Sequence, residues 1–133
     1  MKRFLLVIAV VGFAGAPLAC DNPFASDQSV RLSVTQLDAP AAISAGSPLT
    51  VTLTVNTGGC VGFDHFEVER RTSVGTLTVW GRDAAKGRED IACTDDIRVE
   101  LHTYTFDPPF QSPFTVQVDR GRLSPLIAVV QVQ

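Results

Sequence analysis

The stretch Leu49-Thr50-Val51-Thr52-Leu53-Thr54-Val55 alternates an aliphatic side chain with a threonine along its whole length. Successive side chains of a β-strand point to opposite faces, so this segment has one apolar face and one polar face. Such alternation is typical of an antiparallel strand that packs one face on a core and turns the other to water. The stretch therefore predicts a β-sheet protein.

Six further segments carry the same period of two, and strands are expected near residues 30–34, 63–71, 74–82, 97–101, 114–118 and 127–132. The positions predicted to face the core are Val30, Leu32, Val34, Phe66, Val68, Leu77, Val79, Ile97, Val99, Leu101, Phe114, Val116 and Val118. Turn residues separate the strands, and no segment keeps a helical period. About seven short strands predict an all-β chain folded as a single antiparallel β-sandwich. A small closed β-barrel is the alternative, because alternation alone does not distinguish a closed sheet from two packed ones.

The N-terminal segment has the layout of an export signal, with Lys2 and Arg3 before an apolar run over 4–14 and small residues after it. The apolar run is too short to span a bilayer, which takes about 20 residues. The residues Pro17-Leu18-Ala19-Cys20 resemble the lipobox of bacterial lipoproteins. This resemblance implies cleavage before Cys20 and a lipid on its thiol. The alternatives are ordinary signal cleavage after Ala14-Gly15-Ala16 and an unmodified Cys20.

The expected organisation follows from this N-terminus: a signal peptide over 1–19, a lipidated cysteine and polar tether over 20–28, and a β-sandwich over 29–133. The expected location is the bacterial cell envelope. The lipid on Cys20 would anchor the protein to a membrane, at the periplasmic face or at the cell surface. Loss of the signal leaves 9 basic and 14 acidic side chains and a net charge of −5. Such an acidic domain without a basic stripe is a poor partner for nucleic acid.

Two cysteines remain once Cys20 is assigned to lipid. An exported chain meets an oxidising compartment, so Cys60 and Cys93 are expected to form a disulfide. Two buried free thiols are the alternative, whereas a metal site lacks further ligands at the required spacing. The order Cys60, Trp80, Cys93 resembles that of immunoglobulin-like sandwiches and implies their general topology. The chain departs from that family because Cys60 follows a Gly-Gly turn and Ile91 replaces the expected tyrosine.

Both histidines are predicted on strand faces that point away from the core. His65 alternates with Phe66, and His102 alternates with Leu101. On neighbouring strands the two histidines would be able to hold zinc together with Asp64 or Glu67. Two unrelated solvent-facing histidines are the favoured interpretation, so no metal and no cofactor are expected.

The most charged stretch is residues 81–96, which contains Glu89, Asp90, Asp95 and Asp96. Calcium binding would need a regular spacing of oxygen ligands, which is missing, so a solvated loop is the favoured interpretation. A polar loop tied down by a disulfide is also where a rigid sandwich would present a contact surface. These four acidic residues are therefore predicted to belong to a possible binding surface.

Trp80 and Tyr104 complete the predicted binding surface, because the alternation of their strands turns both away from the core. Exposed aromatic side chains are favoured in recognition sites. The favoured interpretation is nevertheless that these rings lie in the core or cover a strand edge, because a bulge would turn them inward and large aromatics are mostly buried.

No catalytic motif is present, so the chain is not expected to be an enzyme. The favoured hypothesis is a lipid-anchored binding or structural module of the envelope that contacts a protein or a glycan. An inhibitor of a lysozyme-type enzyme is the second hypothesis, since an acidic domain suits a basic enzyme. A metal-assisted hydrolase that uses His65 and His102 is the third.

Overall fold

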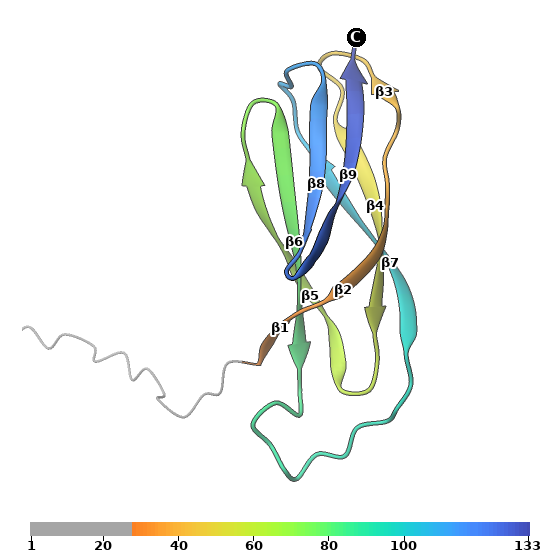
Figure 1. Ribbon diagram of the computed structural model, residues 1–133, viewed down its shortest axis with the longest axis vertical. Helices are drawn as coiled ribbons and strands as arrows, with labels where there is room; N and C mark the ends of the chain where they lie inside the picture. The colour runs from red at the N-terminus through yellow and green to blue at the C-terminus, as the bar shows by residue number, and fades with distance from the viewer. Residues whose placement is uncertain (1–27) are drawn as a thin grey trace, which may run out of the picture.

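The computed structural model describes residues 28–133, which form nine β-strands and no helix (Figure 1). The strands are β1 (Ser29–Arg31), β2 (Ser33–Asp38), β3 (Ala42–Ile43), β4 (Leu49–Thr57), β5 (Val61–Arg70), β6 (Val74–Asp83), β7 (Arg98–Phe106), β8 (Phe114–Arg120) and β9 (Leu123–Val132). Within these residues, accordingly, no helix is available to cross a membrane. The predicted signal peptide, Cys20 and all but the last residue of the predicted tether lie outside the described residues.

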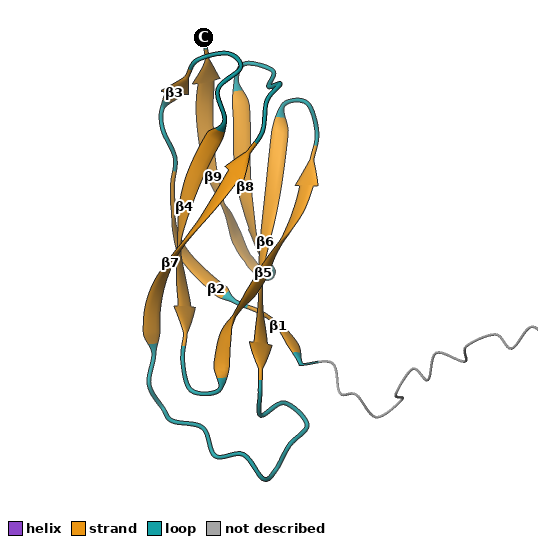
Figure 2. Ribbon diagram, turned by 180° about the vertical axis from the view of Figure 1, so that it is seen from behind, coloured by secondary structure: helices purple, strands orange, loops and turns teal. Residues whose placement is uncertain are grey.

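The strands form two sheets that pack face to face, as Figure 2 shows. The smaller sheet has the order β2-β4-β7, and the larger runs β5-β6-β8-β9-β3, with β1 also beside β6. Most neighbours are antiparallel, whereas β6–β8 and β3–β9 are parallel. The predicted β-sandwich is therefore confirmed, and the closed barrel is excluded. Six of the expected strands correspond to β4–β9, the expected strand at 30–34 corresponds to β1 and β2 together, and the two-residue strand β3 is an addition.

The chain changes sheets at Leu32, which divides one expected strand into β1 and β2. Strand β1 pairs with the end of β6, while β2 pairs with β4 in the other sheet. Leu32 is buried between them, and its N–H donates to the carbonyl oxygen of Val79 at 2.9 Å. A Cβ atom on Gly81 would lie 2.5 Å from a methyl carbon of Leu32. Glycine at position 81 thus makes room for the crossing.

The core lies between the two sheets and follows the predicted alternation in most strands. Its buried members are Leu32, Val34, Leu49, Val51, Leu53, Val55, Leu77, Val79, Phe106, Phe114, Val116, Val118 and Val130. The aliphatic face of the 49–55 stretch is completely buried, which confirms the prediction made from it. Val30, Phe66 and Val68 pack on the edge of this core.

Strand β7 presents the opposite face to the one predicted. Ile97, Val99 and Leu101 are 77%, 67% and 70% exposed, so the prediction that they face the core is wrong. The inner face of β7 is instead formed by the even-numbered positions, which include Tyr104 and the fully buried Phe106. Only one parity can face the core, and large rings bury more apolar area than the three aliphatic side chains.

Aromatic rings fill the space between β5 and β7. Phe66 contacts Tyr104 edge-on at 5.6 Å between ring centroids, and Tyr104 contacts Phe106 at 4.8 Å. Phe106 in turn meets Phe114 of β8 at 5.7 Å. Edge-to-face contacts at these distances are favourable, so this row of rings joins the two sheets on the side where β5 faces β7.

Candidate binding surface

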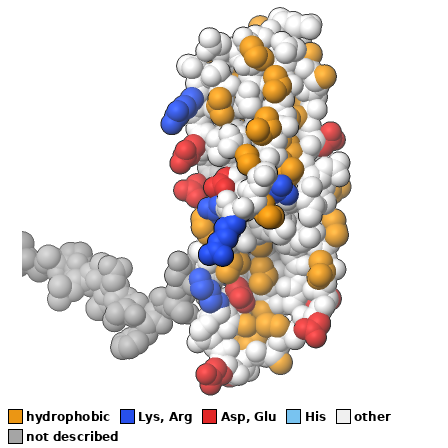
Figure 3. All heavy atoms as spheres, viewed as in Figure 1, with side chains coloured by type: hydrophobic (Ala, Val, Ile, Leu, Met, Phe, Trp, Pro, Cys, Tyr) orange, Lys and Arg blue, Asp and Glu red, His pale blue; other side chains and the backbone are white. Residues whose placement is uncertain are grey.

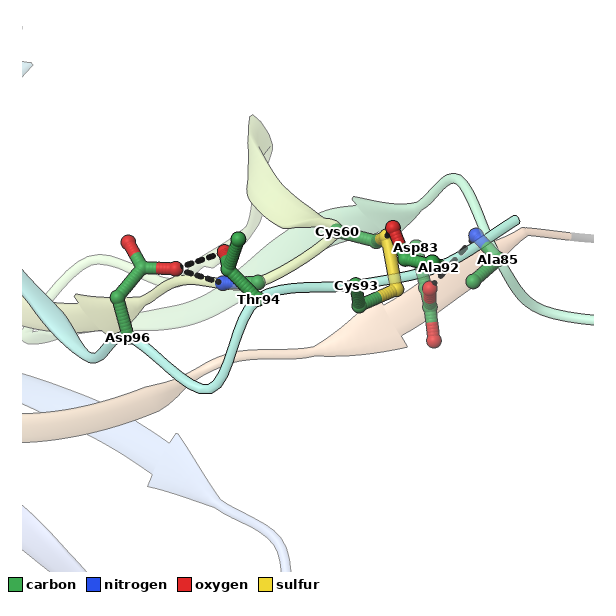
Figure 4. Close-up of a disulfide and its surroundings, with 8 residues drawn as sticks. Cys60, Asp83, Ala85, Ala92, Cys93, Thr94 and Asp96 are labelled. Carbon is green, nitrogen blue, oxygen red and sulfur yellow. Dashed lines mark hydrogen bonds between the residues drawn. A yellow bond between two sulfur atoms is a disulfide. The ribbon is translucent and has the colours of Figure 1, made fainter.

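The Cys60–Cys93 disulfide is present and confirms the predicted pairing (Figure 4). It ties the turn between β4 and β5 to the loop that connects β6 and β7, residues 84–97. This disulfide-held loop lies at the end of the sandwich opposite the C-terminus (Figure 1). The bond therefore fixes a loop at the end of the sandwich and does not join the two sheets through the core.

The four acidic residues predicted for the binding surface all lie exposed on or beside this loop. One oxygen of Asp96 accepts hydrogen bonds from the Thr94 hydroxyl and from the N–H of Gly59 (Figure 4). The other oxygen accepts a hydrogen bond from Arg98. The Thr94 hydroxyl and then the Gly59 N–H hold the pKa of Asp96 below its usual value.

The other three acidic residues do not converge with Asp96 on a common point. The Arg88 guanidinium, 2.9 Å from the carboxylate of Asp90, lowers the pKa of that group. Among residues 28–133, no group of three His, Cys, Asp or Glu side chains is placed to hold a metal ion. Glu89, Asp90 and Asp95 are thus exposed acidic side chains with no metal-binding geometry.

His102 and Tyr104 face the interior, so the prediction from alternation that they point away from the core is wrong. The His102 ring stacks on Phe63 with a centroid distance of 3.9 Å, and its Nε2 lies 2.9 Å from a carboxylate oxygen of Glu100. Tyr104 belongs to the aromatic row between the sheets. His65 is exposed on β5, in the other sheet, so the two histidines do not form a shared ligand set.

Trp80 faces outward from β6, as the alternation of its strand predicted, and is held there from two sides. Its indole N–H donates to the carboxylate of Glu67 on β5 at 2.7 Å. The guanidinium of Arg31 on β1 lies 5.6 Å from the centre of the indole and forms an ion pair with Asp119 of β8 at 2.9 Å. We call Arg31, His65, Glu67, Trp80 and Asp119 the Trp80 cluster. Four strands of the larger sheet contribute to it.

A bulge in β5 places His65 in this cluster. The register with β6 shifts between Phe63 and His65, so Asp64 is an extra residue without a partner across the sheet. Phe63 packs on the core, and after the bulge His65 lies opposite Trp80. Asp64 approaches His65 Nδ1 at 2.8 Å and Arg82 at 3.6 Å. Bulges commonly redirect side chains in this way, and here the bulge places an imidazole ring opposite the indole.

A shallow hollow of about 530 Å³ lies against Trp80 and is lined by Ser29, His65, Phe66, Glu67 and Trp80. Figure 3 shows this face of the molecule, with acidic and basic side chains side by side over β1, β5 and β6 and mostly hydrophobic side chains over β9. An indole face next to a carboxylate and a guanidinium offers an apolar platform with directional hydrogen-bonding groups. That combination suits an amphipathic ligand group.

Sequence reasoning found Trp80 but missed its partners, because Arg31, Glu67 and Asp119 come from three different strands that only the sheet brings together. In the sequence, each of these three residues is marked only as a polar residue within an alternating strand, and many other residues share that feature. Both cysteines of residues 28–133 are used in the disulfide. Comparison with protein-family models, with curated proteins and with solved structures finds no match to this chain.

Proposed function

We propose that this protein is a lipid-anchored binding module of the bacterial cell envelope, without catalytic activity, that contacts a glycan or a protein through the Trp80 cluster. The observation that supports this most is the fixed orientation of the Trp80 indole on the surface of the sheet. Large aromatics and arginines are the residues that contribute most to binding energy at interfaces.

The cluster is organised before a ligand arrives. Glu67 and Arg31 each hold the indole, and Asp119 holds Arg31. Binding therefore costs little additional ordering of these side chains, which favours affinity. The apolar face of a sugar ring, or an apolar side chain of a protein, would lie on the part of the indole that the Arg31 guanidinium leaves open, while polar groups meet Glu67 and His65.

The anchoring part of the proposal rests on the lipobox resemblance at Cys20. Gln28 lies eight positions after Cys20, and its carbonyl oxygen accepts a hydrogen bond from the backbone N–H of Asp83 at 2.9 Å. A fully extended segment of that length spans at most about 29 Å. Ser29 lines the hollow beside Trp80, so a lipid on Cys20 would hold the cluster within reach of ligands close to the membrane.

Crosslinking in native envelopes, followed by mass spectrometry, tests the binding function. The unchanged chain should recover a reproducible partner or glycan, and Trp80→Ala should recover much less of it. Val129→Ala is the control, because Val129 is exposed on β9 and takes no part in the cluster. Equal recovery by Trp80→Ala and the control would exclude the Trp80 cluster as the contact surface. The intact mass of the mature protein tests the anchor separately, since lipid on Cys20 adds a defined mass.

Inhibition of a lysozyme-type enzyme is a second candidate, favoured by the exposed carboxylates of Glu89, Asp90 and Asp95 on the disulfide-held loop. A basic enzyme would be attracted to this acidic loop. Micromolar protein should then slow cell-wall lysis by lysozyme, and reversing the charge of the three carboxylates should abolish the effect. An unchanged lysis rate with the unaltered protein would eliminate this candidate.

A further inference from the structure

Strand β7 has one edge without a partner. It pairs with β4 through nine consecutive residue pairs, from Arg98 to Phe106, without a shift in register. No other strand of residues 28–133 pairs with it, and its lower half lies at the margin of the molecule in Figure 2. Alternate residues of an antiparallel strand turn their N–H and C=O groups away from the partner. The free edge of β7 therefore presents a row of backbone groups that are able to pair with another strand.

An apolar stripe runs along the same edge. Ile97, Val99 and Leu101 are each more than two-thirds exposed and lie on the outer face of the smaller sheet. Their neighbours across the sheet are polar, with Asn56 opposite Val99 and Thr54 opposite Leu101. Within the smaller sheet, the exposed large apolar side chains thus lie on β7 and on Ile97 directly before it, where a further strand would cover them.

The other strands with an open edge carry features that discourage pairing. Strands β2 and β5 contain register shifts, and β1 and β3 are only three and two residues long. Strand β9 contains Pro125, which has no N–H to donate. Bulges, short length and proline are the usual protection of sheet edges. Strand β7 has neither a bulge nor a proline and is nine residues long.

We propose that β7 pairs antiparallel with β7 of a second copy of this chain, with Val99 opposite Val99 across a two-fold axis. This register places Ile97 opposite Leu101 of the second copy, so the two apolar stripes cover each other. On the other face it places Arg98 opposite Glu100 of the second copy, twice by symmetry, and opposite charges in facing positions stabilise a sheet. The proposal is independent of the lipid anchor and of the Trp80 cluster.

Neighbouring registers are less favourable for a physical reason. Moving the axis by one residue places Glu100 opposite Glu100, and like charges in facing positions are destabilising. The odd positions 97, 99 and 101 are apolar, and the even positions 98 and 100 are charged. A register that pairs odd positions with even ones would therefore place apolar side chains opposite charged ones. Axes at Ile97 or Leu101 keep the alternation but place Val99 opposite Asp95 or Thr103, so the register centred on Val99 is the one that covers the whole apolar stripe.

Single cysteine substitutions at positions 97, 99, 101 and 103 of the full chain, expressed in a bacterium and treated with a mild thiol oxidant, test the proposal. A disulfide needs two Cβ atoms within about 4.5 Å, so Val99→Cys should give about tenfold more reducible dimer than Val129→Cys, the exposed control on β9. Thr103→Cys is a control on the same strand and face, because its facing residue would be Asp95. The variants alter exposed side chains and leave the core unchanged.

Arg98→Glu gives a second, independent measurement. It places two acidic side chains opposite each other in the proposed register and should reduce the yield of the Val99→Cys dimer. A crosslinking maximum at Val99 that Arg98→Glu lowers would support the pairing. The proposal would be overturned by any of three results. These are a crosslinking maximum at another position, a dimer yield no higher than that of Val129→Cys, and a yield that Arg98→Glu does not change.

Discussion

The contact between Gly75 and Phe106 gives the sharpest test of how the two sheets pack. Gly75 lies on the inner face of β6, where a Cβ atom would be 2.5 and 2.8 Å from two ring carbons of Phe106 and 3.2 Å from the ring of Phe114. Ordinary contacts begin near 3.4 Å. Gly75 does not have a positive φ angle, so alanine is compatible with its backbone. The cost of Gly75→Ala must therefore come mainly from the ring of Phe106, with a smaller part from the ring of Phe114.

The magnitudes follow from this geometry. Overpacking a core costs about 1–3 kcal/mol, so Gly75→Ala should lower the free energy of unfolding by that amount. Phe106→Ala alone should cost about 3–5 kcal/mol, because it leaves a cavity. In the Phe106→Ala background the obstructing ring is gone, and Gly75→Ala should be neutral or stabilise by up to about 1 kcal/mol, since it restricts the unfolded chain. The coupling energy between the two sites should therefore be about 1–4 kcal/mol.

Equilibrium unfolding in urea measures the free energy of unfolding of the unaltered protein, of Gly75→Ala, of Phe106→Ala and of the double variant. Far-UV circular dichroism reports the sheets, and the fluorescence of Trp80, which is the single tryptophan, reports the larger sheet. Phe106→Leu replaces Phe106→Ala if the latter does not fold, since it also removes the ring. A cost of Gly75→Ala that is the same within about 0.5 kcal/mol in both backgrounds would refute the described packing of β6 against β7.

Three further predictions concern the disulfide-held end of the sandwich. Replacing Cys60 and Cys93 by serine should lower the free energy of unfolding by about 3.7 kcal/mol, the chain-entropy value for a separation of 33 residues, and a loss below about 1 kcal/mol in urea unfolding would contradict this. The hydroxyl of Thr57 and then the His102 side chain lower the pKa of Glu100, so its ionised form stabilises the fold above the ordinary value of 4.5, and this contribution is lost as the pH falls through the lowered pKa. The melting temperature of Glu100→Gln should thus lie below that of the unaltered protein at pH 7 and approach it in acid; a constant difference would show that another effect dominates. Gly58→Ala should cost about 1–3 kcal/mol in the same urea assay, because Gly58 has a φ of +136° and its Cβ would overlap the carbonyl oxygen of Asp96, and an unchanged midpoint would contradict this.

The alternation of apolar and polar residues predicted the buried face correctly in strands whose apolar residues all lie on one face. The 49–55 stretch, Val34 on β2 and Phe114–Val118 on β8 all place their apolar residues in the core as expected. In these strands the local pattern and the global packing agree, so a period of two is sufficient. The Cys60–Cys93 pair was also predictable, because only two cysteines remain when Cys20 is set aside.

The same reasoning predicted the wrong buried face for β7, because both faces of that strand carry apolar residues. Aliphatic residues occupy 97, 99 and 101, while rings occupy 102, 104 and 106. A local pattern does not say which set is buried, since that depends on the rings of β5 and β8 that lie opposite. The same uncertainty misplaced His102 and Tyr104 and concealed the apolar stripe on the free edge of β7.

The amino-acid sequence on its own determined the β-sheet class, the strand positions and the partner of each bonded cysteine, because these depend on local alternation and on cysteine counting. Only the tertiary structure decided which face of β7 is buried, where the chain changes sheets at Leu32, and that Arg31, Glu67 and Asp119 surround Trp80. These features depend on which strands become neighbours, and residues distant in the sequence contribute to each of them. The period of two in a single strand carries no information about that choice.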